Sequence, residues 1–173
     1  MRAYERFLQY ARVWTTSDED SAASPSTQRQ KDLAAILKQE LEALGADTCT
    51  ADEQGYVYAS FGASPGCEQA PAIGFVAHMD TAPAYSGQNV APILHENYDG
   101  GDVRLPKDGT VISVADYPFL KDLAGQTLIT ADGSTLLGAD DKAGIAEILT
   151  ACERLLAEGL PHGRVCVAFT PDE

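Results

Sequence analysis

Three short polar clusters contain the residues whose types and spacing could support catalysis. They are residues 78–80 (HMD), 138–141 (GADD) and 170–173 (TPDE). The first and third follow apolar runs typical of buried strands, and the second stands where a helical pattern begins. Because ligands bind at the carboxyl ends of the strands in open α/β sheets, this shared placement predicts a common site.

The first cluster pairs an imidazole with a carboxylate. Side chains two residues apart point to the same face of an extended backbone, so His78 and Asp80 can interact. One ring nitrogen of His78 could bind a divalent metal ion while Asp80 holds the other nitrogen and raises the basicity of the ring. Taken alone this H-x-D pattern is weak, because a single histidine near a strand end is more often structural.

The other two clusters supply carboxylates. Asp140 and Asp141 stand at the expected start of a helix, where a carboxylate caps free N–H groups and complements the helix dipole. Alternatively, one of the two caps the helix while the other bridges cations. Glu173 follows the strand end marked by Pro171, and it is either a general base in metal-assisted hydrolysis or an ordinary solvated loop charge.

The charge balance bears on the partners that the chain could bind. Twelve Lys and Arg residues against 26 Asp and Glu residues give a formal net charge of -14. This charge repels nucleic-acid phosphates and anionic lipid headgroups, so we expect neither a nucleic-acid nor a membrane partner. It attracts a divalent metal ion or the protonated amine of a peptide, although an acidic surface also serves solubility.

The N-terminus and the cysteines indicate a compartment. Residues 1–14 are amphipathic without the apolar core of a signal peptide, and no apolar run approaches the ~20 residues that span a bilayer. We therefore expect a cytoplasmic protein. The cysteines fall in no C-x-x-C spacing, and we expect all four to be reduced and structural: Cys49, Cys67, Cys152 and Cys166.

The elements that would position the clusters follow from the apolar pattern. A chain of 173 residues with 45% hydrophobic content predicts about one domain with a core. Helices are predicted over residues 4–14 and 27–44, the second with a Thr27–Gln30 capping box and Gly45 as its left-handed C-cap. A strand is predicted over residues 56–61. Residues 72–77 (AIGFVA) predict a second strand that is central and buried.

The second half of the chain alternates loops, strands and one helix. Residues 81–110 predict a long excursion of loops and short strands, and the turn at Asp132-Gly133 predicts a hairpin between residues 127–129 and 135–137. An apolar helix face runs from Ile145 to Leu156, and a buried strand is predicted over residues 165–169. This alternation predicts an α/β layer architecture.

The three clusters occur in an order that resembles the signature of the co-catalytic zinc peptidase family. The segments that carry this resemblance are residues 78–81 (HMDT), 137–144 (LGADDKAG) and 169–173 (FTPDE). Within the family the similarity is greatest to tripeptide aminopeptidases, through residues 74–83, 86–90, 96–102, 125–130 and 161–163. The match runs through nearly the whole chain, and the ordered set is specific.

The resemblance implies a fold and a set of roles. The fold is a layered mixed sheet with covering helices of the phosphorylase/hydrolase-like type, of which residues 1–173 form the N-terminal part of the catalytic domain. The rest of that domain and the lid or dimerisation domain are absent. Two zinc ions are implied in the parent enzyme, with His78 as a ligand, Asp140 as the bridging ligand, Asp80 orienting His78 and Glu173 as the general base.

The resemblance also implies a cis peptide between Asp140 and Asp141, and further zinc ligands beyond Glu173. We therefore expect the 173-residue chain to bind zinc weakly at best and to be inactive. The strand over residues 165–169 is expected to lack a neighbour, which leaves an exposed sheet edge through which the chain could self-associate.

The activity implied for the parent is release of the N-terminal residue of tripeptides, with a small peptide as substrate. Two alternatives stay open. One is a related enzyme, either a di- or carboxypeptidase or an N-acyl amino acid deacylase. The other is a non-catalytic fragment or interaction module that keeps the fold without the reaction.

Overall fold

The structure is a computed structural model that describes residues 1–173. Its helices and strands are, in chain order, α1 (Ala3–Tyr10), α2 (Gln30–Ala43), β1 (Thr48–Ala51), β2 (Val57–Phe61), β3 (Ile73–His78), β4 (Ile93–His95), β5 (Val103–Arg104), β6 (Val111–Ile112), the 3-10 helix η1 (Pro118–Leu123), β7 (Leu128–Thr130), α3 (Ala139–Ala157) and β8 (Val165–Thr170). None of the helices combines the length and the apolar character needed to cross a membrane.

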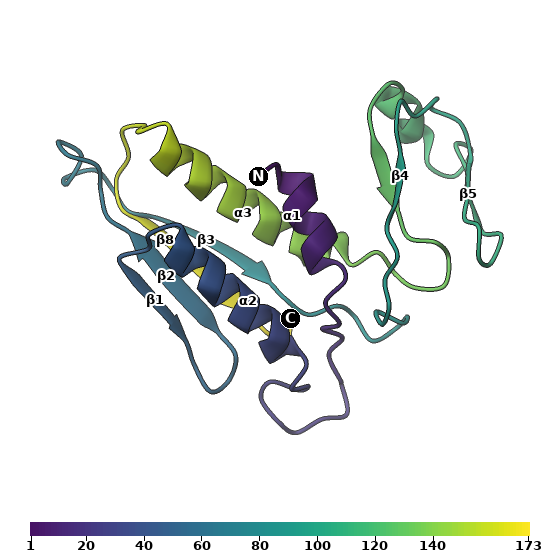
Figure 1. The fold of residues 1–173 in the computed structure, drawn as a ribbon. Coiled ribbons are helices and arrows are strands. Elements are labelled where there is room, and N and C mark those ends of the chain that lie inside the picture. The colour runs from purple at the N-terminus through teal and green to yellow at the C-terminus, as the bar shows by residue number, and fades with distance from the viewer.

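Four strands form the main sheet, in the order β1-β2-β8-β3. Strand β8 pairs antiparallel with β2 and parallel with β3, so the sheet is mixed. Along β8 the residues alternate: Val165, Val167 and Phe169 are buried, and the residues between them are half-buried. The buried side chains face the three α-helices, which cover one face of the sheet (Figure 1). The predicted α/β layer architecture is confirmed.

The core lies between this sheet and its helices. Helix α2 packs on β1 and β2, and α3 packs on β3 and on α1. Leu33, Leu37 and Leu41 recur every four residues along α2 and are fully buried, as are Ile145 and Leu149 on α3. This spacing places them on one face of each helix, so the predicted helix faces are the ones that pack.

The segment between β3 and α3 forms a separate small lobe beside the sheet (Figure 1). It contains two two-stranded antiparallel sheets, β4-β7 and β5-β6, around a core of Tyr98, Val103 and Leu120. The expected excursion of loops and short strands is thereby confirmed.

The predicted hairpin in this lobe is wrong. Strand β7 pairs with β4 rather than with residues 135–137, which form no strand. Gly133 does adopt a left-handed turn with φ 97°. The Asp132 carboxylate, however, accepts hydrogen bonds from the backbone N–H and the hydroxyl of Ser134. These bonds close a local turn, and the segments on either side of it do not pair as a hairpin.

Two expectations about strand position are also wrong. Strand β3 is an edge strand rather than a central one, and of its apolar residues only Ala77 is buried. Strand β8, expected at an open edge, lies between two neighbours. An apolar run indicates that a strand can be covered on both faces, but it does not specify which neighbours the chain supplies.

Helix α2 begins three residues later than expected. The Thr27 hydroxyl donates to the Thr16 carbonyl instead of capping the helix. The side-chain Nε2 of Gln30 donates to the Thr27 hydroxyl and to the Asp172 carboxylate. The predicted capping box is therefore not formed. At the other end, Gly45 has φ 87°, which confirms the left-handed C-cap.

Candidate active site

The carboxyl ends of β3 and β8 meet at one edge of the sheet. These strands are parallel, and His78 pairs in register with Thr170. The polar cluster that follows each strand therefore lies beside the other. His78 Nε2 is 3.1 Å from Asp140 Oδ1 and 3.5 Å from Glu173 Oε2. The predicted convergence of these residues at one end of the sheet is confirmed.

Asp80 lies on the other side of the same imidazole. Its Oδ1 is 3.3 Å from His78 Nδ1, and it also accepts a hydrogen bond of 3.1 Å from the Glu173 backbone N–H. Only 4% of the Asp80 side chain is exposed, against 74% for Glu173 and 93% for Asp140. Asp80 is therefore a buried residue that contacts both the His78 ring and the chain segment that carries Glu173.

The surrounding carboxylates change the proton affinity of His78. Burial lowers the pKa of the imidazole, because it disfavours the charged ring. The hydrogen bond to Asp140 and the charges of Asp80 and Glu173 outweigh this effect and raise the pKa above its ordinary value. The site thus favours a positive charge at the ring.

The entry into α3 separates the roles of its two aspartates. The Asp140–Asp141 peptide is cis, as the resemblance implied, and neither residue has helical dihedral angles. Asp141 Oδ1 accepts the N–H of Gly144 at 3.1 Å, which is a helix-capping contact. Asp140 instead faces His78. The capping interpretation is therefore confirmed for Asp141, and the cation-bridging role of Asp140 stays a prediction.

A shallow cavity of about 220 Å³ lies at the exposed side of these residues. Its walls come from three chain segments, namely the end of β3, the start of α3 and the C-terminal residues: His78, Thr81, Ala82, Leu136, Gly138, Ala139, Asp140 and Glu173. No group of three or more His, Cys, Asp or Glu side chains is arranged to hold a metal ion. These residues thus place one imidazole and two exposed carboxylates beside a small cavity.

A hydrogen-bonded brace that the sequence did not reveal holds the segment before Glu173. Gln30 is fully buried; its Nε2 donates to Asp172 Oδ1 at 2.6 Å and its Oε1 accepts the Asp172 N–H at 3.1 Å. Ser26 donates to the same carboxylate through its N–H and its hydroxyl. Burial raises the pKa of Asp172, but these donors outweigh it and lower the pKa below its usual value.

A signal for this brace was present in the pattern. Position 30 lies on the same helical face as Leu33, Leu37 and Leu41, so a glutamine there implies a polar partner in the interior.

Lys142 is a second buried polar residue beside the site. Its side chain is almost fully covered, and Nζ donates to the Val13 carbonyl at 2.8 Å. Burial lowers the pKa of Lys142 to about 8, opposed by the negative charge of nearby Asp80. This lysine joins the segment after α1 to the start of α3, directly behind the site.

Sequence comparison identifies relatives of this chain. The chain is 54% identical over 171 residues to peptidase T of Desulfitobacterium hafniense and 53% identical over 171 residues to peptidase T of Geobacillus kaustophilus, covering 98% of this chain in both cases. The chain is homologous to peptidase T. It spans 41% of the length of these relatives. No family model matches the chain.

Solved structures of similar fold include two bacterial peptidases. A tripeptidase of Staphylococcus aureus aligns with a TM-score of 0.64 and 25% identity, over 98% of this chain and 36% of that one. An aminopeptidase PepT of Bacillus cereus aligns with a TM-score of 0.65 and 21% identity over the same shares. The mixed-sheet layer seen here is therefore the fold found in these peptidases.

Proposed function

We propose that residues 1–173 form the N-terminal part of the catalytic domain of a zinc-dependent aminopeptidase that removes the N-terminal residue of tripeptides. One observation carries the proposal: His78 Nε2 faces the carboxylates of Asp140 and Glu173 while Nδ1 faces Asp80. Homology to peptidase T over nearly the whole chain supports the reaction class.

The donor atoms at this point suit zinc. An imidazole nitrogen and carboxylate oxygens are ordinary zinc ligands, and a carboxylate on the second ring nitrogen is the usual support for a metal-binding histidine. We assign His78 and Asp140 as ligands of the bound ions. When present, zinc would polarise the scissile carbonyl and lower the pKa of a bound water.

The protein side chains then have separate tasks. Asp80 accepts the Nδ1 proton of His78, which keeps Nε2 free to bind the metal. Glu173 takes a proton from the attacking water and delivers it to the leaving amine, the role of a general base followed by a general acid. Its backbone N–H is held by Asp80 and its neighbour Asp172 by Gln30, so the base is placed by buried groups.

The surroundings favour a small peptide with a free amine. The cavity of about 220 Å³ is bordered by exposed carboxylates, and the chain carries a net charge of -14. A protonated N-terminus is therefore attracted, whereas an extended or anionic substrate gains less.

The experiment compares tripeptides that differ only at the N-terminus. A polypeptide of the relatives' length that contains this region should release the N-terminal residue of a free tripeptide with zinc and leave the N-acetylated tripeptide intact. Preferential cleavage of the acetylated substrate would instead support an N-acyl amino acid deacylase, and release of the C-terminal residue a carboxypeptidase. We expect no turnover from the 173-residue chain alone.

Two variants separate the roles of the carboxylates. Glu173→Gln should lower kcat by ~10²-fold or more with zinc content unchanged, because a general base contributes about that much. Asp140→Asn should lower zinc content as well. Equal zinc loss in both variants would contradict the assigned roles.

A further inference from the structure

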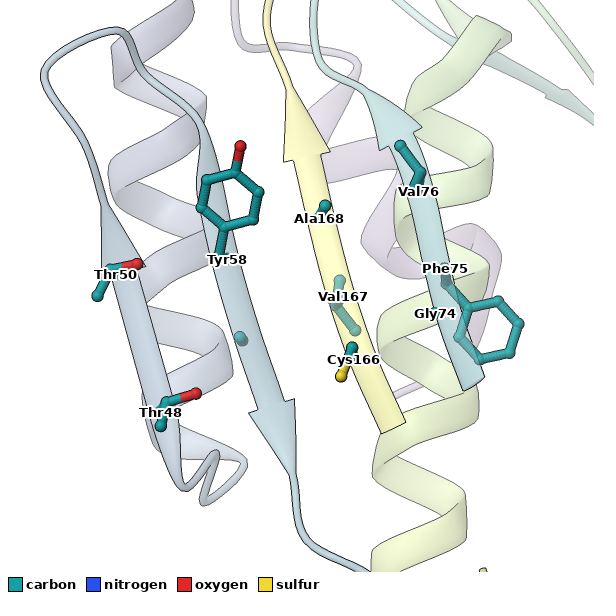
Figure 2. A pocket seen from close by; sticks show the side chains of 10 residues that line it. Thr48, Thr50, Tyr58, Gly74, Phe75, Val76, Cys166, Val167 and Ala168 are labelled. Carbon is teal, nitrogen blue, oxygen red and sulfur yellow. The ribbon is translucent and has the colours of Figure 1, made fainter. Parts of the chain in front are cut away.

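Matching aspartates stand two residues past the ends of β3 and β8. Figure 2, a view from the face opposite the helices, shows that these strands lie side by side and run in the same direction. His78 pairs with Thr170, so Asp80 and Asp172 hold equivalent positions beyond the two strands. Asp80 contacts the His78 ring and the Glu173 N–H. The hydrogen bonds of Asp172 go instead to the start of α2 and to the loop before it.

The backbone of Asp172 is left-handed. Its φ is 49°, in a region that side chains other than glycine seldom adopt and that persists only where the surroundings hold it. This turn lies between the end of β8 and Glu173, so it sets the direction in which Glu173 leaves the strand. If Asp172 relaxed to an extended backbone, Glu173 would move relative to Asp80.

Four hydrogen bonds hold Asp172 in this conformation. Gln30 makes two of them, since its Nε2 donates to Oδ1 at 2.6 Å and its Oε1 accepts the backbone N–H at 3.1 Å. Ser26 makes the other two, from its N–H to Oδ2 at 2.6 Å and from its hydroxyl to Oδ1 at 2.5 Å. Asp172 is exposed whereas Gln30 is fully buried, so Gln30 is the fixed partner.

The loop between α1 and α2 also contacts the segment that carries Asp80. The N–H of Ser17 donates to the Thr81 carbonyl at 3.1 Å, and the Ser17 hydroxyl donates to the same oxygen at 3.2 Å. Within the loop, the N–H of Asp18 donates to the Ser26 hydroxyl at 3.0 Å. One stretch of chain therefore joins the two segments that follow β3 and β8.

We propose that Ser26 and Gln30 are positioning residues for the base: they hold Asp172 in its left-handed turn and thereby set the direction of Glu173. This inference rests on the proposed function, in which Glu173 is the general base. Neither Ser26 nor Gln30 borders the cavity of the site, so both act through Asp172. A base must lie within hydrogen-bond reach of the attacking water, and a displacement of ~1 Å can lower the rate by ~10²-fold.

An exchange of donor and acceptor tests this contact. Gln30→Glu sets a second carboxylate against Asp172. Asp172→Asn sets an amide donor against Nε2 of Gln30 or, with the amide turned over, against the N–H of Ser26. In the double variant, the introduced amide donates to the introduced carboxylate, whose other oxygen still accepts the backbone N–H of residue 172. The Ser26 hydroxyl accepts as well as donates, and asparagine tolerates a left-handed backbone, so the double variant rebuilds the contact.

The readouts are kcat, KM and zinc content of a polypeptide of the relatives' length that contains this region, at a temperature where circular dichroism shows each variant to be folded. Gln30→Glu and Asp172→Asn should each lower kcat by ~10-fold or more. KM and zinc content should hardly change, because the base acts on the water in the transition state and is not a ligand. The double variant should recover most of the lost kcat. Gln28→Glu adds the same charge at an exposed position nearby and should leave kcat unchanged.

Ser26→Ala keeps the test decisive if Gln30→Glu fails to fold. It removes one donor to Asp172 without adding a charge, and it should lower kcat by ~3-fold or more with zinc content unchanged. Unchanged kcat in the folded single variants, or a double variant no more active than either of them, would overturn the positioning role. Loss of zinc together with kcat would overturn it too, because the contact would then hold the whole site rather than the base.

Failure of the proposed function gives a different result. In that case the unmodified polypeptide itself releases no residue from a tripeptide, and the positioning role is overturned together with the reaction. Full turnover of the unmodified polypeptide with equal turnover of Gln30→Glu overturns the positioning role alone.

Discussion

Gln30 and Lys142 are buried polar side chains that lie behind the exposed carboxylates of the candidate site. Gln30 holds Asp172, the residue before the proposed base, and Lys142 lies near Asp80, which holds His78. The two exposed side chains, Asp140 and Glu173, have few contacts of their own. Their positions depend on these buried partners, so the geometry of the site can be tested by substituting the buried residues.

Gln30→Leu should destabilise the fold by about 1–3 kcal/mol. The substitution leaves the Asp172 backbone N–H without its partner and removes one donor from its carboxylate in a buried setting. Urea unfolding measures the change. Gln28→Leu is the matched control, because Gln28 is exposed and should shift stability by less than about 0.5 kcal/mol. Equal effects of both variants would mean that the brace contributes nothing.

Lys142→Met should change how stability depends on pH. The pKa of Lys142 is lowered to about 8 in the folded chain, against 10.5 for the free side chain. The unfolded state therefore binds the proton more tightly, and the unmodified chain gains stability as pH rises from about 8 toward 10.5, by roughly 3 kcal/mol in total. The methionine variant lacks this gain.

The measurement for this prediction is the free energy of unfolding of both chains at a series of pH values from neutral to mildly alkaline. Other titrating groups are common to both, so they cancel in the difference. Curves that run parallel through this range would show that Lys142 is not buried as its contacts indicate.

At this scale the sequence predicted the four side chains that converge at the site and missed Gln30 and Lys142, the buried residues that lie behind them. His78, Asp80, Asp140 and Glu173 were found because they follow strands or start a helix, a placement visible in the pattern. The partners of Gln30 and Lys142 are 142 and 129 residues away along the chain. Periodicity indicates that Gln30 faces the interior, but it does not show which distant residue it contacts.

At the scale of elements, β8 organises the site. It is the strand that both β2 and β3 pair with, and its parallel pairing with β3 brings Thr170 beside His78. Its two faces have different surroundings, since Val167 faces the helices and the neighbouring side chains face the uncovered side.

Val167→Ala should cost about 2 kcal/mol of stability, because it removes two buried methyl groups from the core beside the helices. The same substitution at Val76, which is 66% exposed on β3, should cost less than about 1 kcal/mol. Chemical denaturation of the two variants compares them directly. A larger loss at Val76 than at Val167 would contradict the sheet order.

The apolar pattern predicted which segments form strands better than it predicted their neighbours. Strands β2, β3 and β8 lie within about one residue of the expected ranges, whereas β1 was not foreseen and β3 and β8 exchanged their expected positions. The order of strands depends on contacts between distant segments. The same limit explains the failed hairpin at Asp132-Gly133, where the turn was predicted correctly and its partner strand was not.

At the scale of the whole molecule, two features belong together: the net charge of -14 and the cluster of one histidine and three carboxylates at one end of the sheet. The chain spans 41% of the length of the peptidase T relatives that it matches. The activity proposed above is that of a protein of the relatives' length, while the proposed zinc ligands His78 and Asp140 can be tested in this chain by itself.

The chain contains three histidines, which makes the central claim directly measurable. His95 Nε2 lies 3.0 Å from the Thr130 hydroxyl and His162 Nδ1 lies 2.8 Å from the Gly163 carbonyl, both away from the site. Nuclear magnetic resonance resolves the nitrogens of all three rings, and it detects weak zinc binding as well as tight binding.

The measurement is a zinc titration of the chain at mildly alkaline pH, followed through the ring nitrogens. The account predicts that Nε2 of His78 shifts toward its metal-bound value while Nδ1 keeps the proton that it shares with Asp80, that His95 and His162 do not respond, and that Asp140→Asn weakens the response. Zinc shifts at His95 or His162 with none at His78, or an unchanged His78 response in Asp140→Asn, would contradict the proposed metal site.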